Sequence, residues 1–143
     1  MGLDPRFPRQ FESFGEDPLL VKTFGEAMIR GYQGDSNQVH NKIKIAACMK
    51  HFIGYHATIS GKDRTPSYIP DHVLSEYHIP SFKAAIDAGA KTIMINSGII
   101  NGIPVHSSYK ILTDLLRNRL GFEGVILTDW EDIRKLHDRD KVA

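Results

Sequence analysis

Several residue types and patterns that define protein classes are scarce in this sequence. Its single cysteine, Cys48, excludes an internal disulfide and leaves the redox compartment open. No apolar run is long enough to span a bilayer, and the first residues show no apolar signal-peptide segment. The net charge is only +1 and Lys and Arg are scattered, which argues against a nucleic-acid or anionic-membrane partner.

The composition that remains is that of a globular domain. The chain has 143 residues, of which 41% are hydrophobic and 24% are charged. This length suggests one compact domain, and the apolar content is enough for one core. The sequence shows neither an internal repeat nor a low-complexity segment.

Short apolar runs alternate with helical patterns along the chain. The apolar runs predict buried strands at residues 43–49, 92–96 and 124–128, and a partial strand at 2–4. Helical periodicity and capping residues predict helices at 17–34, 73–88 and 107–121, and Pro80 is predicted to kink the second. Such alternation implies a parallel sheet covered by helices, an α/β fold.

Polar residues collect directly after the predicted strands. They are Arg9, the pair Lys50 and His51, the pair Asn96 and Ser97, and Asp129. In α/β folds the carboxyl ends of the strands form the edge where ligands bind. We therefore expect Arg9, Lys50, His51 and Asp129 to converge at one edge of the sheet.

Asp129 follows the apolar run at residues 125–128 and precedes Trp130. A carboxylate beside an indole is frequent in sugar sites, because the indole face stacks on the apolar side of a pyranose. The alternative is a strand-end aspartate that caps a helix or pairs with an arginine. These two residues alone do not decide between the two interpretations.

Lys50 and His51 are adjacent, and adjacent strand residues normally point to opposite faces. For both to enter one site the backbone must be distorted, for example by a non-proline cis peptide. The alternative is a surface lysine beside a core histidine. His51 and His56 are a weak indication of a metal site, and we expect neither a metal nor a cofactor.

Arg9 lies in a segment, residues 6–18, that interleaves aromatic and charged residues without a period. Such a segment is unusual for a purely structural loop. The alternative is a salt-bridged loop in which Arg6 and Arg9 pair with acidic residues. The candidates for that pairing are Glu12, Glu16 and Asp17.

Taken together, the motifs resemble glycoside hydrolase family 3, in the order that family has them. They are DPRFPR at residues 4–9, ESFGEDP at 12–18, KHF with a following glycine at 50–54, NGIPVH at 101–106, LTDLLR and LGFEG within 112–124, and TDW at 128–130. The resemblance covers nearly the whole chain. It implies that residues 1–143 are part of the family's N-terminal (β/α)8-type barrel, roughly half of it, without the C-terminal α/β domain.

The resemblance also implies roles for individual residues. Asp129 would be the catalytic nucleophile, and Trp130 would form a wall of the subsite for the leaving sugar. The donors Arg9, Lys50 and His51 would bind the hydroxyls of the non-reducing-end sugar. The implied reaction is hydrolysis of β-glucosides or β-glucans at the non-reducing end, by a retaining mechanism, in the full-length enzyme. Full-length members of the family are often secreted, periplasmic or lysosomal.

Two features of the sequence refine this resemblance. Ser97 stands where many members have a tyrosine, so substrate contacts near the nucleophile are altered. The loop at residues 54–64 lacks the Asp-Ser-His of bacterial β-N-acetylglucosaminidases, which points to the β-glucosidase branch, whose acid/base is a glutamate in the second domain. Glu131 and Asp132 are expected to turn outward, so we expect the isolated chain to be inactive.

Two other functions remain open at this point. The chain could be a non-catalytic carbohydrate-binding or interaction remnant that keeps sugar affinity without turnover. It could also be an α/β-barrel lyase that uses Lys50 as a Schiff base, as strand-end lysines do in aldolases. The lyase interpretation leaves the other motifs unexplained.

Overall fold

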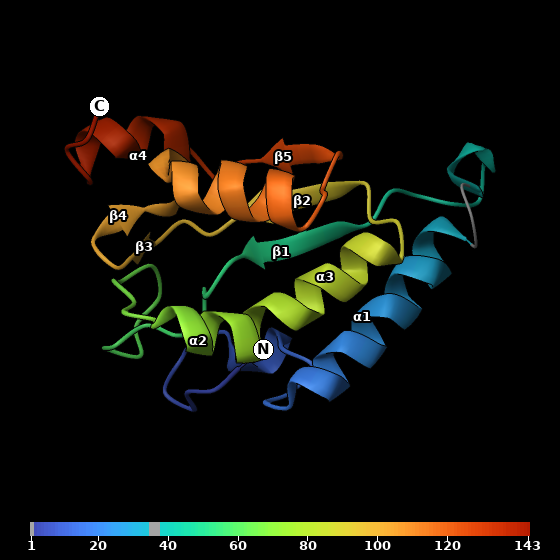
Figure 1. Cartoon of the computed structure of the whole chain (residues 1–143), viewed down its shortest axis with the longest axis horizontal. Coiled ribbons are helices and arrows are strands. Elements are labelled where there is room, and N and C mark those ends of the chain that lie inside the picture. The colour runs from blue at the N-terminus through green and yellow to red at the C-terminus, as the bar shows by residue number, and fades with distance from the viewer. Residues whose placement is uncertain (1, 35–37) are drawn as a thin grey trace.

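The structure is a computed structural model that describes residues 2–34 and 38–143 (Figure 1). Its strands β1 (Cys48–Phe52), β2 (Thr92–Ile95) and β5 (Val125–Leu127) form a parallel sheet in the order β1-β2-β5. A short antiparallel hairpin, β3 (Ile99–Ile100) and β4 (Ile103–Pro104), follows β2. This arrangement confirms the predicted α/β fold with a parallel sheet.

Helical segments connect and cover these strands. The longer ones are α1 (Pro18–Gln33), the continuous run α2 (Asp71–Val73), η3 (Leu74–His78) and α3 (Ile79–Asp87), then η5 (Lys110–Arg119) and α4 (Asp132–Asp138). Single 3-10 turns occur at η1 (Gln10–Glu12), η2 (Gln38–His40) and η4 (Val105–Ser107). Helices α1 and α3 lie side by side, as Figure 1 shows.

The two ends of α1 are formed by the capping residues on which the helix prediction was based. The carboxylate of Asp17 accepts a hydrogen bond from the Leu19 amide at 2.7 Å, and Pro18 occupies the first helical position. Gly34 ends the helix with a φ of 78°, a conformation that favours glycine. The predicted helix at 17–34 is therefore confirmed.

Pro80 does not break the helical run, but the turn that precedes it is irregular. The turn from Leu74 to His78 is π-helical, and the Ile79 amide donates to the Leu74 carbonyl, five residues back. Proline cannot donate the next hydrogen bond of an α-helical ladder, and a widened turn is a common local adjustment. The helix predicted at 73–88 is present, from Asp71 to Asp87, with this irregular turn.

The strand predicted at residues 43–49 is wrong in its position, because β1 begins only at Cys48. Ile43 and Ile45 are 81% and 63% exposed. The side chain of Asn41 accepts from the Ile43 amide at 3.2 Å, and its carbonyl accepts from the Lys44 amide at 2.9 Å. These bonds form a turn, so part of the apolar run belongs to a loop.

The partial strand predicted at residues 2–4 is also absent from the structure, which describes this segment from Gly2 onward. The amide of Gly2 donates to the carbonyl of Gly15 at 3.0 Å, and Gln10 donates to the carbonyl of Gly2 at 2.8 Å. The segment thus folds back on its own neighbours. Met1 lies outside the described residues.

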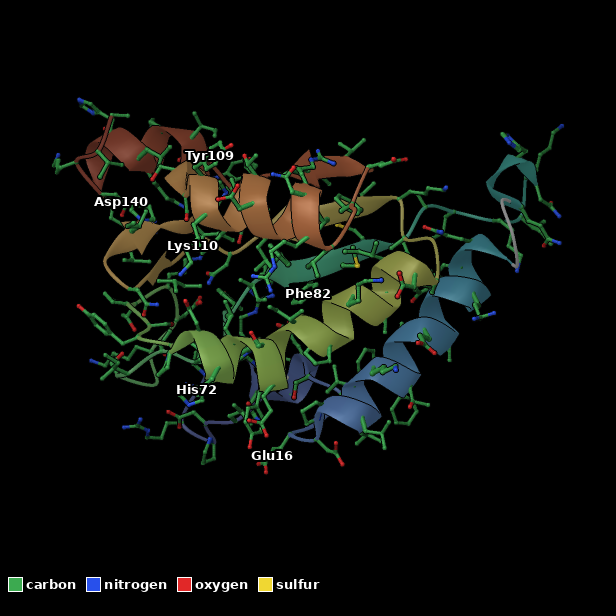
Figure 2. All side chains as sticks on the ribbon, viewed as in Figure 1. Glu16, His72, Phe82, Tyr109, Lys110 and Asp140 are labelled. Atoms are coloured by element: carbon green, nitrogen blue, oxygen red, sulfur yellow. The ribbon has the colours of Figure 1, made fainter. Side chains whose placement is uncertain are left out.

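The core lies between the sheet and its helices. Phe52, Ile93 and Ile95 from the strands are at most 1% exposed, and Leu116 of η5 is fully buried with them. Phe82 points from α3 toward β1 (Figure 2), where its ring meets that of Phe52 edge to face at 5.0 Å. Helix α3 is therefore held to the first strand by an aromatic pair.

A cavity of about 420 Å³ is lined by residues of α1, α3 and β1. Its walls include Met28, Tyr32, Met49 and Ala85, so they are mainly apolar. Its far end reaches His51 and Glu12, beside the polar edge of the sheet. Among the residues that the structure describes, no helix is both long enough and apolar enough to cross a membrane.

Removal of the Phe52 ring should strongly destabilise the fold. We expect Phe52→Ala to lower the free energy of unfolding by about 3–5 kcal/mol, because it leaves a cavity at the centre of the core. Phe11→Ala is the matched control, since Phe11 is 83% exposed and should change stability by less than about 0.5 kcal/mol. Urea denaturation measures both, and equal losses would contradict this description of the core.

Candidate active site

The carboxylate of Asp129 is the centre of a polar cluster beyond the end of β5. Its Oδ2 atom lies 3.1 Å from Nη2 of Arg64 and 3.9 Å from Nε2 of His51. Its Oδ1 atom accepts the backbone N–H of Trp130 at 2.6 Å. The side chain of Asp129 is 15% exposed, so it is sheltered and still reachable from solvent.

Asp129 is held in its ionised form. Burial by itself would raise the pKa of this carboxyl group, but the Trp130 amide and the charge of Arg64 outweigh burial, and the net pKa lies below the ordinary value of 3.8. The charge of Lys135 contributes in the same direction. At neutral pH the group is therefore a carboxylate, as a nucleophile or an electrostatic stabiliser must be.

His51 is neutral at the same pH. Burial is the main cause that lowers its pKa to about 4, and the positive charges of Arg9 and Lys50 add to it. The opposing effect of Asp129 is smaller. A neutral imidazole has one donor and one acceptor nitrogen, so His51 can both donate to and accept from a hydroxyl group.

Arg9 reaches the cluster through Tyr55. Its Nη1 atom donates to the Tyr55 hydroxyl at 2.9 Å, and the ring of Tyr55 lies 4.2 Å from that of His51. Arg9 also forms a two-pronged ion pair with Glu12, with distances of 2.6 and 2.7 Å. One element of the salt-bridged alternative is thus present, and it fixes the guanidinium beside Tyr55.

Lys50 and Trp130 lie at the exposed side of the cluster. Lys50 shares with His51 the wall of a small cavity of about 40 Å³, and its charge acts on both His51 and Glu12. The indole of Trp130 is 76% exposed, although its backbone amide is bonded to Asp129. The structure describes no hydrogen bond or ion pair between Lys50 and Asp129 within residues 2–34 and 38–143.

The backbone around His51 is distorted, as the adjacency of two candidate site residues, Lys50 and His51, predicted. The register of β1 against β2 shifts between Met49 and Phe52. The peptide bonds Lys50–His51 and Phe52–Ile53 are cis. Cys48 and Lys50 are exposed while Met49, His51 and Phe52 are buried.

The segment after β2 forms a second polar group. Asn96 is 2% exposed and braces two loops, since it donates to the Ile53 carbonyl at 2.8 Å and accepts from the Gly98 amide at 2.7 Å. Ser97 is fully buried and donates to Oδ1 of Asp132 at 2.7 Å. Both residues therefore support the cluster rather than enter it.

The expectation that Asp132 turns outward is wrong, because its side chain is only 1% exposed. It is neutralised in its buried position by Lys135, whose Nζ atom lies 3.0 Å from Oδ1. Glu131, by contrast, is exposed, as predicted. Glu131 has a left-handed φ of 56°, and α4 begins at the next residue, Asp132.

Sequence reasoning missed three residues of the cluster: Tyr55, Asp63 and Arg64. All belong to the loop at residues 54–70, which connects β1 to α2. The Tyr55 hydroxyl donates to Asp63 as well as accepting from Arg9. The unusual length of the loop was the available indication, but it could not specify which of its side chains turn inward.

Comparison with known proteins places this chain beside glycosidases. The profile described as "Glycosyl hydrolase family 3 N terminal domain" matches residues 1–143. A lysosomal beta glucosidase of Dictyostelium discoideum is 51% identical over 95% of this chain, which covers 17% of that protein. A beta-xylosidase of Formosa agariphila is 36% identical over 98% of the chain, which covers 20% of that protein.

Solved structures agree in fold. A β-glucosidase from Erythrobacter marinus matches with a TM-score of 0.96 and 38% identity, over 100% of this chain and 19% of that one. A β-glucosidase from Listeria innocua in complex with gluconolactone matches with a TM-score of 0.94 and 35% identity, over 100% and 20%. The chain thus spans about a fifth of these structures. Its sheet is part of the predicted (β/α)8 TIM-type barrel.

Loss of the Arg64 charge should make Asp129 a weaker acid. We expect Arg64→Met to raise the pKa of Asp129, because a cation 3.1 Å away that favours the carboxylate is removed. Carbon-detected NMR titration of the Asp129 carboxyl group measures the change. Lys62→Met removes the same charge from an exposed position of the same loop and is the control. Identical titration curves for both variants would contradict the assigned pair.

Three histidines should make the fold sensitive to acid. Burial lowers the pKa of His51, His56 and His78 from 6.5 to about 4, so the folded chain keeps them neutral where the unfolded chain binds protons. Their contribution to stability is therefore complete above pH 6.5 and is lost as the pH falls toward 4. Linkage predicts the uptake of up to about three protons on unfolding near pH 5.

Urea denaturation between about pH 7 and pH 5 measures this dependence, in a range above the ordinary carboxyl pKa values. His78→Gln should reduce the proton uptake by about one, since one buried histidine is removed. His137→Gln is the control, because the His137 side chain is 73% exposed. A free energy of unfolding that does not change across this range would show that the histidines are not protected.

Proposed function

The chain belongs to glycosyl hydrolase family 3, within its N-terminal domain, and from that premise we propose that it carries the nucleophile side of a retaining β-glucosidase site. The observation that carries the proposal is the state of Asp129. It lies beyond the carboxyl end of β5, ionised, sheltered, and flanked by Arg64 and neutral His51. A carboxylate in this position is suited to attack an anomeric carbon.

The neighbouring side chains are suited to hold a sugar. Arg9 and Lys50 are cationic donors, and His51 offers a donor and an acceptor, so the three match the hydroxyl groups of one pyranose. Arg9 is fixed by Glu12 and Tyr55, which lowers the entropy cost of using it as a donor. The exposed indole of Trp130 is free to stack on the sugar in the leaving-group position.

Arg64 joins this set as the partner of Asp129. Its charge keeps the carboxylate ionised before reaction. The contact at 3.1 Å also restricts the rotation of the carboxylate, so that one oxygen is occupied while the other accepts the Trp130 amide. Both contacts hold Asp129 in one orientation, as a nucleophile requires.

A retaining glycosidase also needs a second carboxyl group about 5–5.5 Å from the first, to protonate the leaving oxygen. Asp132 is unsuited to this role, because its buried carboxylate is already bonded to Ser97 and Lys135. We propose that the acid/base comes from a part of the full-length enzyme outside residues 1–143. The relatives, of which the chain spans about a fifth, leave ample length for it.

A β-glucoside is the substrate class that the comparisons favour. Listeria innocua β-glucosidase, whose fold this chain shares, has been solved with glucose and, as a mutant, with laminaribiose. The relative that shares 51% identity is also a β-glucosidase by name. The β-xylosidases at 36–37% identity are the nearest competing class among the named relatives. Membership of this family argues against the Schiff-base lyase.

A mechanism-based reagent should label Asp129. We expect an aryl 2-deoxy-2-fluoro-β-glucoside with a good leaving group to add one fluoroglucosyl group to the chain. Its aryl oxide leaves without being protonated, so this step needs no general acid. Peptide mass spectrometry should locate the adduct on Asp129. Asp129→Asn should abolish labelling, and Asp138→Asn, an exposed aspartate of α4, should not. Labelling elsewhere, or persistent labelling of Asp129→Asn, would refute the nucleophile role.

The isolated chain should not turn over an unactivated substrate. General acid–base catalysis contributes about 10²–10⁴-fold. Within residues 2–34 and 38–143 the structure describes no contact between Asp129 and a second carboxyl group that could supply it. We expect no release of glucose from cellobiose above background, measured by a coupled glucose assay. Steady turnover at a rate ordinary for a glycosidase would mean that residues 1–143 contain the acid/base. Sugar affinity without labelling would favour the binding-remnant alternative.

A further inference from the structure

Asp132 is the most deeply buried acid beside the proposed nucleophile, and the mechanism described so far does not use it. Its Oδ1 atom accepts from the Ser97 hydroxyl at 2.7 Å and from Nζ of Lys135 at 3.0 Å. Nε2 of His106 lies 3.5 Å from Oδ2, and the His106 side chain is only 6% exposed. Burying even a paired carboxylate is costly, because the loss of hydration can exceed the attraction between the two charges, so this arrangement calls for a reason.

The partners of Asp132 come from different parts of the chain. Ser97 follows β2, His106 lies in η4, and Lys135 lies one turn further along α4. Arg139, at the end of α4, donates to the Ser97 carbonyl at 2.8 Å and so holds the other side of the same residue. Asp132 therefore ties the segment that follows β5 to the segment that follows β2.

The same residues restrain the loop that carries Asp129. The Asp132 amide approaches the carbonyl of Asp129 at 3.4 Å, and Lys135 donates to the carbonyl of Trp130 at 2.6 Å. Lys135 thus holds the loop backbone and the Asp132 carboxylate together. Between these points Glu131 adopts its left-handed φ of 56°. The loop from Asp129 to Asp132 is thus held by two backbone contacts, one of which Lys135 links to the Asp132 carboxylate.

Helix capping does not account for the buried carboxylate. The residue that precedes α4 is Glu131, and it makes no side-chain capping bond. Asp132 is the first residue of the helix, yet its oxygens are directed to Ser97 and Lys135 and not to a helical amide. Its partners fix the position of the loop rather than the start of the helix.

We propose that Asp132 is a positioning residue for Asp129, acting through the hydrogen bonds of Ser97 and Lys135. The proposal rests on the proposed function of Asp129 and deepens it. Arg64 and the Trp130 amide orient the carboxylate of Asp129, while Asp132 holds the backbone from which that carboxylate projects. A displacement of about 1 Å at a reacting group can cost about 10²-fold in rate, so a buried anchor at this place has a chemical consequence.

The first test measures loop order and does not depend on glycosidase chemistry. We expect backbone ¹⁵N order parameters of Trp130 and Glu131 near 0.85 in the unaltered chain, and below about 0.6 in Asp132→Asn. Ser97→Ala removes a single hydrogen bond without adding bulk and should give an intermediate value, which covers the case in which Asp132→Asn fails to fold. Asp138→Asn is the control, since the Asp138 side chain is 51% exposed on the same helix.

The second test measures the labelling of Asp129 by the fluoroglucoside, at a temperature where each variant is folded. We expect the maximal labelling rate to fall about 100-fold in Asp132→Asn and by less in Ser97→Ala. The half-saturating concentration should change by less than about threefold, since no sugar-binding donor is altered. A purely structural role would lower the melting temperature but leave the labelling rate of the folded variant unchanged.

The outcomes separate the two proposals. Order parameters that stay unchanged in both variants overturn the anchoring role of Asp132. A loosened loop with a labelling rate within threefold of the unaltered chain overturns its positioning role. If the unaltered chain is not labelled at all, the proposed function of Asp129 fails, and the order parameters alone then decide whether Asp132 anchors the loop.

Discussion

Parallel pairing of β1, β2 and β5 is the constraint on which the polar cluster depends. Because the strands run in one direction, their carboxyl ends open at one edge, and the segments that follow them become neighbours. The irregular register of β1 between Met49 and Phe52 turns His51 toward this edge. With Leu127 in register with Met94, the chain beyond β5 brings Asp129 to 3.9 Å from His51. Without this alignment Asp129, Arg64 and His51 would not be brought into contact.

Charge is distributed unevenly over the cluster, and burial decides how. Asp129 keeps its negative charge because Arg64 and an amide offset the cost of burial, whereas His51 lacks a comparable partner and stays neutral. The charges of Arg9 and Lys50 act on two neighbouring groups, since they favour the carboxylate form of Glu12 and disfavour the imidazolium form of His51. Ionised carboxylates, a neutral imidazole and several cations thus lie together in a single environment.

Local patterns in the sequence identified the helix that begins at Pro18, the strands after Lys91 and Gly124, and the polar edge of the sheet. These features depend on short periods and caps, which a sequence displays directly. The strand predicted at 43–49 was misplaced, because the first part of this apolar run lies in a turn held by Asn41. Ser97 was interpreted as a polar strand-end residue that replaces an aromatic ring, and its bond to Asp132 joins residues 35 positions apart. Such long-range pairs leave no local pattern, so Asp132 and Arg64 became visible only in the fold.

The ion pair between Arg64 and Asp129 spans 65 residues, and this distance has a consequence for the order in which the protein is made. A ribosome adds about 5–20 residues per second, so Asp129 is added about 3–13 s after Arg64. During that interval the nascent chain already carries Arg9, Lys50 and His51, but β5 is missing and the sheet edge is incomplete. Arg9, Lys50, His51 and Arg64 are therefore synthesised first, and the carboxylate of Asp129 joins the cluster only after them.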